Sequence, residues 1–284
     1  MKKLSFILII SILWVFAPGC DESGKSTSQN DNKAQDSATK KPTSKKDSVR
    51  VMTLPTPMQI PALLKNSDLH YAPDMMLPIK SFQKTFFKSS VVFGAYLMDM
   101  SYAAAYGNHQ ASLDYFEACN DIGNNLGLGA TMTEGLAKRF KRNLDRPDSL
   151  GRLILAVYDN GHKLLIHKEK EGIGLLMVMG CYIEGLHFTL NKARQNDLIL
   201  FIHLLHQHKM YGQNLTWMLD QYEIPDEVKN EFMRFEKVAK ILSKMDIPTV
   251  YALKSGSRSV NSINTEDLDL ISEEVKMFRE NVIQ

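Results

Sequence analysis

The feature that most constrains this fold is the 3.6-residue spacing of apolar side chains that dominates the chain after residue 80. Near the C-terminus the apolar positions lie three and four residues apart: Leu268, Ile271, Val275, Phe278 and Val282. Another stripe, from Leu150 to Leu165, continues through Asp159-Asn160-Gly161, a sequence that local rules would assign to a turn. Such spacing places apolar side chains on one face of an α-helix. The sequence therefore predicts an all-α fold.

Residues 49–284 are predicted to form a single helical domain. Half of the ten prolines lie between residues 51 and 80, which favours an extended segment with one short helix near Met58–Asn66. Apolar stripes separated by short polar breaks favour antiparallel helix pairs, stacked as a short α-solenoid or bundle, with a C-terminal helix over 265–283. Thr249–Leu253 is the one segment whose composition also suits a strand.

A short internal similarity relates two of the predicted helices. Gly94-Ala95-Tyr96-Leu97 aligns with Gly180-Cys181-Tyr182-Ile183 at an offset of 86 residues. The succession of helices and polar breaks around the two segments is also alike, which indicates a duplication of residues 86–170 in residues 172–245. The alternative is that any two antiparallel helical hairpins produce the same spacing.

The N-terminus has the pattern of a secretory leader. Lys2 and Lys3 precede an apolar run of 13 residues, Leu4 to Phe16, which is too short to span a bilayer. Ala17-Pro18-Gly19 then lead to Cys20, as in a bacterial lipobox. We expect residues 1–19 to be a lipoprotein signal peptide and Cys20 to carry fatty acyl chains such as palmitate. The alternative is an ordinary signal peptide cut after Ala17.

The residues after Cys20 are predicted to be a disordered tether. Between Asp21 and Ser48 the only apolar residues are Ala34 and Ala38, so this segment cannot offset the entropy of ordering. Flexible-chain statistics give residues 20–48 a reach of about 30 Å. We expect the folded domain to be held near a membrane of the cell envelope, on the periplasmic side, with the outer membrane favoured over the inner.

Two resemblances accompany these patterns. The run from Pro57 to about Leu150, which includes Tyr96, Asp99 and Asp148-Ser149-Leu150, resembles uncharacterised all-helical lipoproteins of Gram-negative bacteria. The segment from Phe93 to Gly127 is similar to a tetratricopeptide-type helix hairpin, although Asp99 stands where that family has a small residue. These resemblances imply a location in the cell envelope and a helical fold, and they imply no activity.

Charge and cysteine content exclude two classes of protein. The chain has 34 Lys and Arg against 32 Asp and Glu, and removal of Lys2 and Lys3 with the leader would leave 32 of each. A balanced chain lacks the basic footprint of a nucleic-acid-binding protein. Three cysteines are too few for a disulfide scaffold, and we expect Cys119 and Cys181 to be free and buried.

Two pairs of residues could form a metal site. Glu184 and His187 lie three apart on one predicted helix, and His203 and His206 lie three apart on the next. If the turn between these helices centres on Gln195, the four side chains face one another at one level, where they would suit Zn²⁺ or another divalent metal. The alternative is a set of half-exposed, hydrogen-bonded histidines, and no other cofactor is expected.

Asp99 is a carboxylate on a mostly apolar helix. A buried carboxylate must be paired or hydrogen-bonded, so Asp99 either lines a ligand-binding pocket or acts as a structural pin to another side chain. Of the two, the pin is the simpler interpretation.

The function that the sequence favours is binding, not catalysis. Motifs for a nucleophilic serine and for a zinc protease are absent from the sequence, which makes an enzyme the weakest hypothesis. We expect a non-enzymatic helical module that binds a partner protein of the envelope. The alternative is a lipoprotein that binds a small ligand or a metal through Glu184, His187, His203 and His206. An exposed apolar concave face would favour the first hypothesis, and an enclosed pocket with converging polar groups the second.

Overall fold

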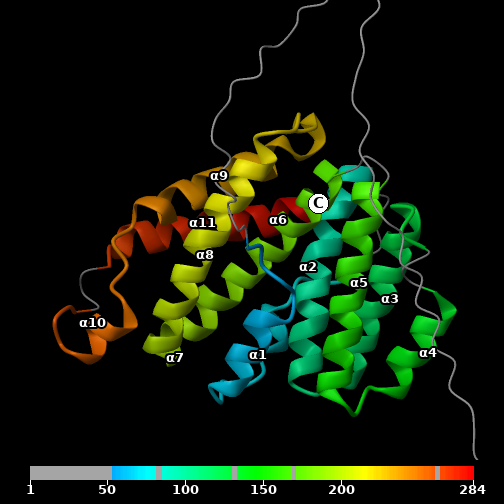
Figure 1. Ribbon diagram of the computed structural model, residues 1–284, viewed down its shortest axis with the longest axis horizontal. Coiled ribbons are helices and arrows are strands. Elements are labelled where there is room, and N and C mark those ends of the chain that lie inside the picture. The colour runs from blue at the N-terminus through cyan, green and yellow to red at the C-terminus, as the bar shows by residue number, and fades with distance from the viewer. Residues whose placement is uncertain (1–52, 81–84, 130–132, 168–170, 260–262) are drawn as a thin grey trace, which may run out of the picture. The chain divides into compact units, whose positions relative to one another are not determined.

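The structure is a computed structural model that describes residues 53–80, 85–129, 133–167, 171–259 and 263–284 (Figure 1). Every regular element in these ranges is a helix, so the prediction of an all-α fold is confirmed. Contacts between Cα atoms group Arg50–Gln284 into one unit. The predicted leader, Cys20 and the tether lie outside the described residues.

The helices follow one another with short connections. The first half of the chain contains α1 (Gln59–Asn66), the 3₁₀ turn η1 (Pro73–Met75), α2 (Phe86–Ala105), α3 (His109–Asn125), α4 (Glu134–Arg142) and α5 (Pro147–His167). The second half contains α6 (Glu171–Phe188), the π-helical turn η2 (Thr189–Ala193), α7 (Arg194–Asn196), α8 (Leu198–Leu219), η3 (Asp226–Val228), α9 (Lys229–Lys244), α10 (Val250–Lys254) and α11 (Thr265–Val282).

Helices α2 and α6 form the centre of the core. Every residue of α2 from Ser89 to Ala104 is buried, so this helix is enclosed on all sides rather than amphipathic. The stretch Gly172–Asn196, which begins in α6, is long and apolar enough to cross a membrane, but 94% of its apolar window is buried inside the folded body. A helix at the centre of a core is apolar on all sides, as a membrane helix is, because neither has a face exposed to water.

Two glycines allow α2 and α6 to pack backbone against backbone. A Cβ atom on Gly94 would lie 1.8 Å from the Met177 carbonyl oxygen, and a Cβ atom on Gly180 would lie 1.9 Å from the Val91 carbonyl oxygen. These contacts are reciprocal, because Met177 is related to Val91 by the same 86-residue offset that relates the two glycines. The segments that are similar in sequence thus meet each other, and the duplication of 86–170 in 172–245 stays a prediction.

The outer helices pack as pairs against this centre. Helix α3 packs on α2, α8 packs on α6 and α9, and α11 packs on α9 and α6 (Figure 1). The connection between α2 and α3 is tight because Gly107 adopts a positive φ of 69° and the Asn108 side chain caps α3. These pairs form the stacked arrangement that the sequence predicts.

Two local predictions have different outcomes. Helix α5 is continuous through Asp159-Asn160-Gly161, as the longer apolar stripe indicates. A strand at Thr249–Leu253 is wrong, because Val250–Lys254 forms the short helix α10. The Thr249 hydroxyl accepts a hydrogen bond from the Ala252 backbone N–H, and this cap favours a helix over a lone strand that would have no partner.

Candidate functional site

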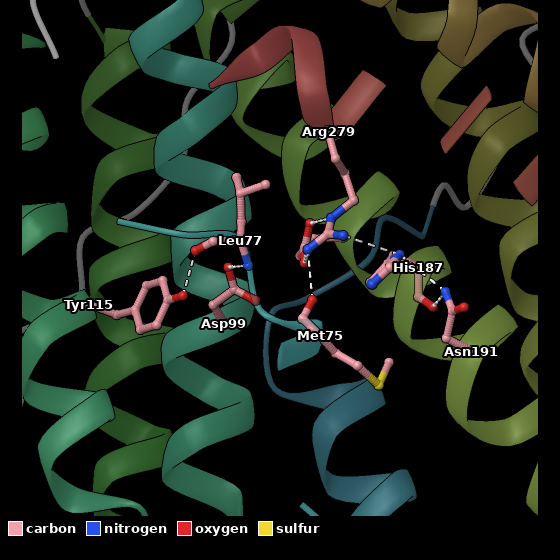
Figure 2. A network of polar contacts seen from close by, with 8 residues as sticks. Met75, Leu77, Asp99, Tyr115, His187, Asn191 and Arg279 are labelled. Carbon is pink, nitrogen blue, oxygen red and sulfur yellow. Dashed lines mark hydrogen bonds and ion pairs between the residues drawn. The ribbon is translucent and has the colours of Figure 1, made fainter. Parts of the chain in front are cut away.

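Asp99 lies fully buried in the core and fastens the segment between α1 and α2. The Leu77 backbone N–H donates to Asp99 Oδ2 over 3.1 Å, and the Tyr115 hydroxyl donates to the Leu77 carbonyl oxygen (Figure 2). Asp99 Oδ1 has no hydrogen-bond partner among the described residues. These contacts are those of a structural pin that joins α2, α3 and the connecting segment.

Glu184 also lies in this buried network, paired with an arginine from the C-terminal helix. Arg279 donates from Nε to Glu184 Oε2 over 2.8 Å and from Nη2 to Glu184 Oε1 over 3.0 Å. The same Nη2 donates to the Met75 carbonyl oxygen over 2.6 Å. A bidentate pair of this kind is strong and directional, so it joins α6, α11 and the connecting segment (Figure 2).

The charge states of Asp99, Glu184 and Arg279 depend on one another. Burial raises the pKa of Asp99 well above its ordinary value, and the nearby Glu184 carboxylate raises it further. Burial also raises the pKa of Glu184, but the Arg279 guanidinium opposes this shift. The neutral form is therefore favoured at Asp99, and Glu184 keeps the ion pair.

His187 belongs to the edge of the same network. Its Nδ1 lies 3.1 Å from the Asn191 amide nitrogen and 3.4 Å from Arg279 Nη1, both of which are donors. Nδ1 therefore accepts, and the ring proton lies on Nε2. Burial, reinforced by the Arg279 charge, lowers the pKa of His187 to about 3, so this histidine is neutral near pH 7.

The two other histidines of the predicted metal site point elsewhere. His203 is exposed, and its Nε2 lies 2.9 Å from the Gln207 amide nitrogen. His206 Nε2 lies 3.2 Å from the Pro248 carbonyl oxygen. Among the described residues no three His, Cys, Asp or Glu side chains come together as a metal would require. The structure thus brings Glu184 and His187 together around Arg279, and it does not bring His203 or His206 to them.

The position of the turn explains this outcome. A turn centred on Gln195 is wrong, because the chain stays helical through Asn196 and breaks at Asp197, which caps α8. With the break at 197, positions 203 and 206 no longer lie as far from the break as positions 187 and 184 do, so the predicted pairing is lost. The π-helical turn Thr189–Ala193 also rotates the end of this helix, because it adds a residue to one turn.

Sequence reasoning missed two residues that the structure places in the core. His208, not His203 or His206, faces α6, where its ring packs on Tyr182, and its Nε2 lies 3.0 Å from the hydroxyl of Thr189 in the π-helical turn that follows. Arg279 is separated from Glu184 by 95 residues, so no local spacing signals the pair. The sequence signal for His208 is its place next to the apolar positions Leu204 and Leu205, one turn before it, on the buried face of α8.

Outside this closed network, a groove lies between α8 and α9. This groove has a volume of about 770 Å³. Trp217 of α8 and Met233 of α9 lie in its walls with 48% and 58% of their surfaces exposed, and Ala239 also lines it. The polar lining includes Asp220 and Glu236.

Two other hollows are less suited to binding a partner. The first, of about 460 Å³, lies between α2 and α3 beneath three exposed carboxylates, Asp114, Glu117 and Asp121. The second, of about 560 Å³, lies between α1 and α5 and contains none of the large exposed apolar side chains. The α8–α9 groove alone among the three has two such side chains, Trp217 and Met233, so it is the candidate functional site.

Comparison of the chain with family models, with curated proteins and with solved structures finds no match. The function proposed for it therefore depends on its own residues and their geometry.

Proposed function

We propose that this protein is a lipoprotein of the cell envelope, anchored through Cys20, whose helical body binds a partner protein without catalysis. The observation that carries the proposal is the α8–α9 groove, where Trp217 and Met233 are half-exposed on facing helices. Large aromatic side chains and methionine are enriched where proteins bind one another, and a groove between two helices suits a helical segment of a partner.

The arrangement of polar groups supports binding over catalysis. Asp99 and His187, two titratable groups with large pKa shifts, are tied into a buried network that joins four helices and the connecting segment. Each of these side chains is held by hydrogen bonds to neighbouring elements, which is what a structural role requires. The half-exposed side chains of Trp217 and Met233 lie instead in the groove, and Trp217 is on the other side of α8 from His208.

The envelope address is supported by the leader pattern that ends at Cys20. The periplasmic side is expected, with the outer membrane favoured over the inner, and the predicted tether would let the body reach a partner some distance from the membrane. Acylation of Cys20 is the first testable consequence. Labelled palmitate should be incorporated into the wild-type protein and not into the Cys20→Ser variant, and label that persists in the variant would contradict the anchor.

Partner binding at the groove is tested by photocrosslinking in living cells. A photoreactive residue at position 213 would line the groove while Trp217 and Met233 stay in place. The matched control is the same residue at position 251 on α10, because Tyr251 is 81% exposed and lies outside the groove lining. A discrete adduct is expected from position 213 and not from position 251. Adducts of equal yield at both positions, or none at 213, would overturn the proposal.

A further inference from the structure

The α8–α9 groove has an uneven distribution of charge. Asp220 and Glu236 line it, and neither belongs to an ion pair among the described residues. Lys237 also lines the groove, but its Nζ is held 2.6 Å from Glu274 Oε1, on a carboxylate that it shares with Arg234. Lys240 is the lining cation that acts on Glu236, whose pKa it lowers.

The two carboxylates repel each other. Partial burial raises the pKa of Glu236, and the negative charge of Asp220 raises it further, while Lys240 opposes the shift. A cation placed between these two carboxylates would relieve this repulsion. The groove is therefore complementary to a positively charged group.

Apolar and hydrogen-bonding groups lie beside the carboxylates. Trp217 and Met233 offer apolar surface from the two walls, and Ala239 lines the groove between the helices. The hydroxyl of Thr216, one residue before Trp217, is buried without a hydrogen-bond partner among the described residues. The groove thus offers apolar walls next to its carboxylates.

We propose that the groove binds an amphipathic, cationic helix of a partner protein, which lays its apolar face on Trp217 and Met233 and places a Lys or Arg side chain at Asp220 and Glu236. This inference rests on the proposed function, because it names the kind of segment that the partner presents. Helices bind helical grooves through apolar residues spaced three and four apart, with charged residues that fix orientation.

Trp217 makes the test direct. The chain has two tryptophans, Trp14 in the predicted leader and Trp217 in the groove, so a Trp14→Phe change or removal of the leader leaves Trp217 as the sole tryptophan reporter. The probe is a synthetic Leu/Lys helix of about 18 residues, long enough to form a helix when it binds. Two control peptides have Glu in place of Lys, or the same residues in scrambled order.

The expected result is a saturable blue shift of Trp217 emission with the Leu/Lys helix. The Leu/Glu helix and the scrambled peptide should bind at least about ten-fold more weakly, because they lack the charge or the apolar face. The double change Asp220→Asn with Glu236→Gln should lower affinity for the Leu/Lys helix and weaken its dependence on salt. The matched control, Asp114→Asn with Asp121→Asn, removes the same charge from the hollow between α2 and α3 and should bind as wild type.

Three results would overturn this inference. They are equal binding of the Lys and Glu helices, unchanged binding by the Asp220 and Glu236 variant, and a blue shift that depends on protein concentration alone, which would identify a second copy of the chain as the occupant. If position 213 forms crosslinks but the cationic helix is not preferred, the protein binds a partner at the groove, and only the inference that the partner segment is cationic is wrong. No crosslinks from 213 would remove the proposed function itself.

Discussion

At the scale of single residues, the buried network links the stability of the protein to the protonation of Asp99. Its pKa is raised above 3.8 in the folded protein, so the folded state holds this proton more tightly than the unfolded chain. The stability that comes from this proton is fully present below the unfolded pKa and is lost as the pH rises through the folded pKa. Asparagine at this position cannot titrate, yet it keeps an acceptor for the Leu77 N–H.

The Asp99→Asn variant should therefore gain stability relative to wild type as the pH rises. Urea unfolding at about pH 5 and about pH 9 measures the difference between the two proteins, so that titration of other groups cancels. Asp99→Ala leaves the buried Leu77 N–H without an acceptor and should be about 1–3 kcal/mol less stable than Asp99→Asn, which does not titrate either, at both pH values. A difference between Asp99→Asn and wild type that does not change with pH would show that Asp99 is ionised throughout.

Breaking the ion pair of Glu184 and Arg279 should lower the free energy of unfolding far more than replacing both residues by apolar ones. Arg279→Met leaves a buried carboxylate without its partner and should lower the free energy of unfolding by about 3–5 kcal/mol. The double change Glu184→Met with Arg279→Met removes both charges and should recover most of this loss. Urea unfolding of the single and double variants measures the recovery, and a double variant less stable than Arg279→Met would contradict it.

At the scale of elements, the crossing of α2 and α6 depends on the absence of two side chains. Gly94→Ala or Gly180→Ala would place a Cβ atom within 2 Å of a carbonyl oxygen, and rigid helix backbones on both sides cannot yield without separating. Each change should destabilise the protein by about 3 kcal/mol or more.

The matched control for these glycines is Gly135→Ala on α4. A Cβ atom at this exposed helical position meets only the Thr133 hydroxyl, at 3.8 Å. Alanine has the higher helix propensity, so this change should be neutral or should stabilise by up to about 1 kcal/mol. Thermal unfolding of the three variants measures the contrast, and similar losses at positions 94, 180 and 135 would argue against a close backbone contact at the crossing.

At the scale of the whole molecule, stability should reside in residues 49–284. The segment from Asp21 to Ser48 has only two apolar residues, Ala34 and Ala38, so it has almost nothing to bury. A chain that begins at Val49 should melt at the same temperature as one that begins at Cys20. A drop of more than about 4 °C, which corresponds to roughly 1 kcal/mol or more in a domain of this size, would show that residues 21–48 pack on the body.

The sequence by itself determined that the body is helical and where many of its helices run. The apolar period at Leu268, Ile271 and Val275 and the stripe through Asp159-Asn160-Gly161 are local properties of the chain, and a helix buries such a stripe wherever it packs. The sequence also determined that Asp99 needs a partner, since a carboxylate on an apolar helix cannot be buried alone.

Only the tertiary structure decided which partners these side chains have. Arg279 reaches Glu184 across 95 residues, and on α8 it is His208 that contacts α6 while His203 is exposed. The groove of Trp217 and Met233 exists because α8 and α9 pack side by side. The helical period determines which face of each helix is apolar. The offset of one helix along another depends instead on contacts between residues far apart in the chain. The spacing of residues within one helix carries no information about those contacts.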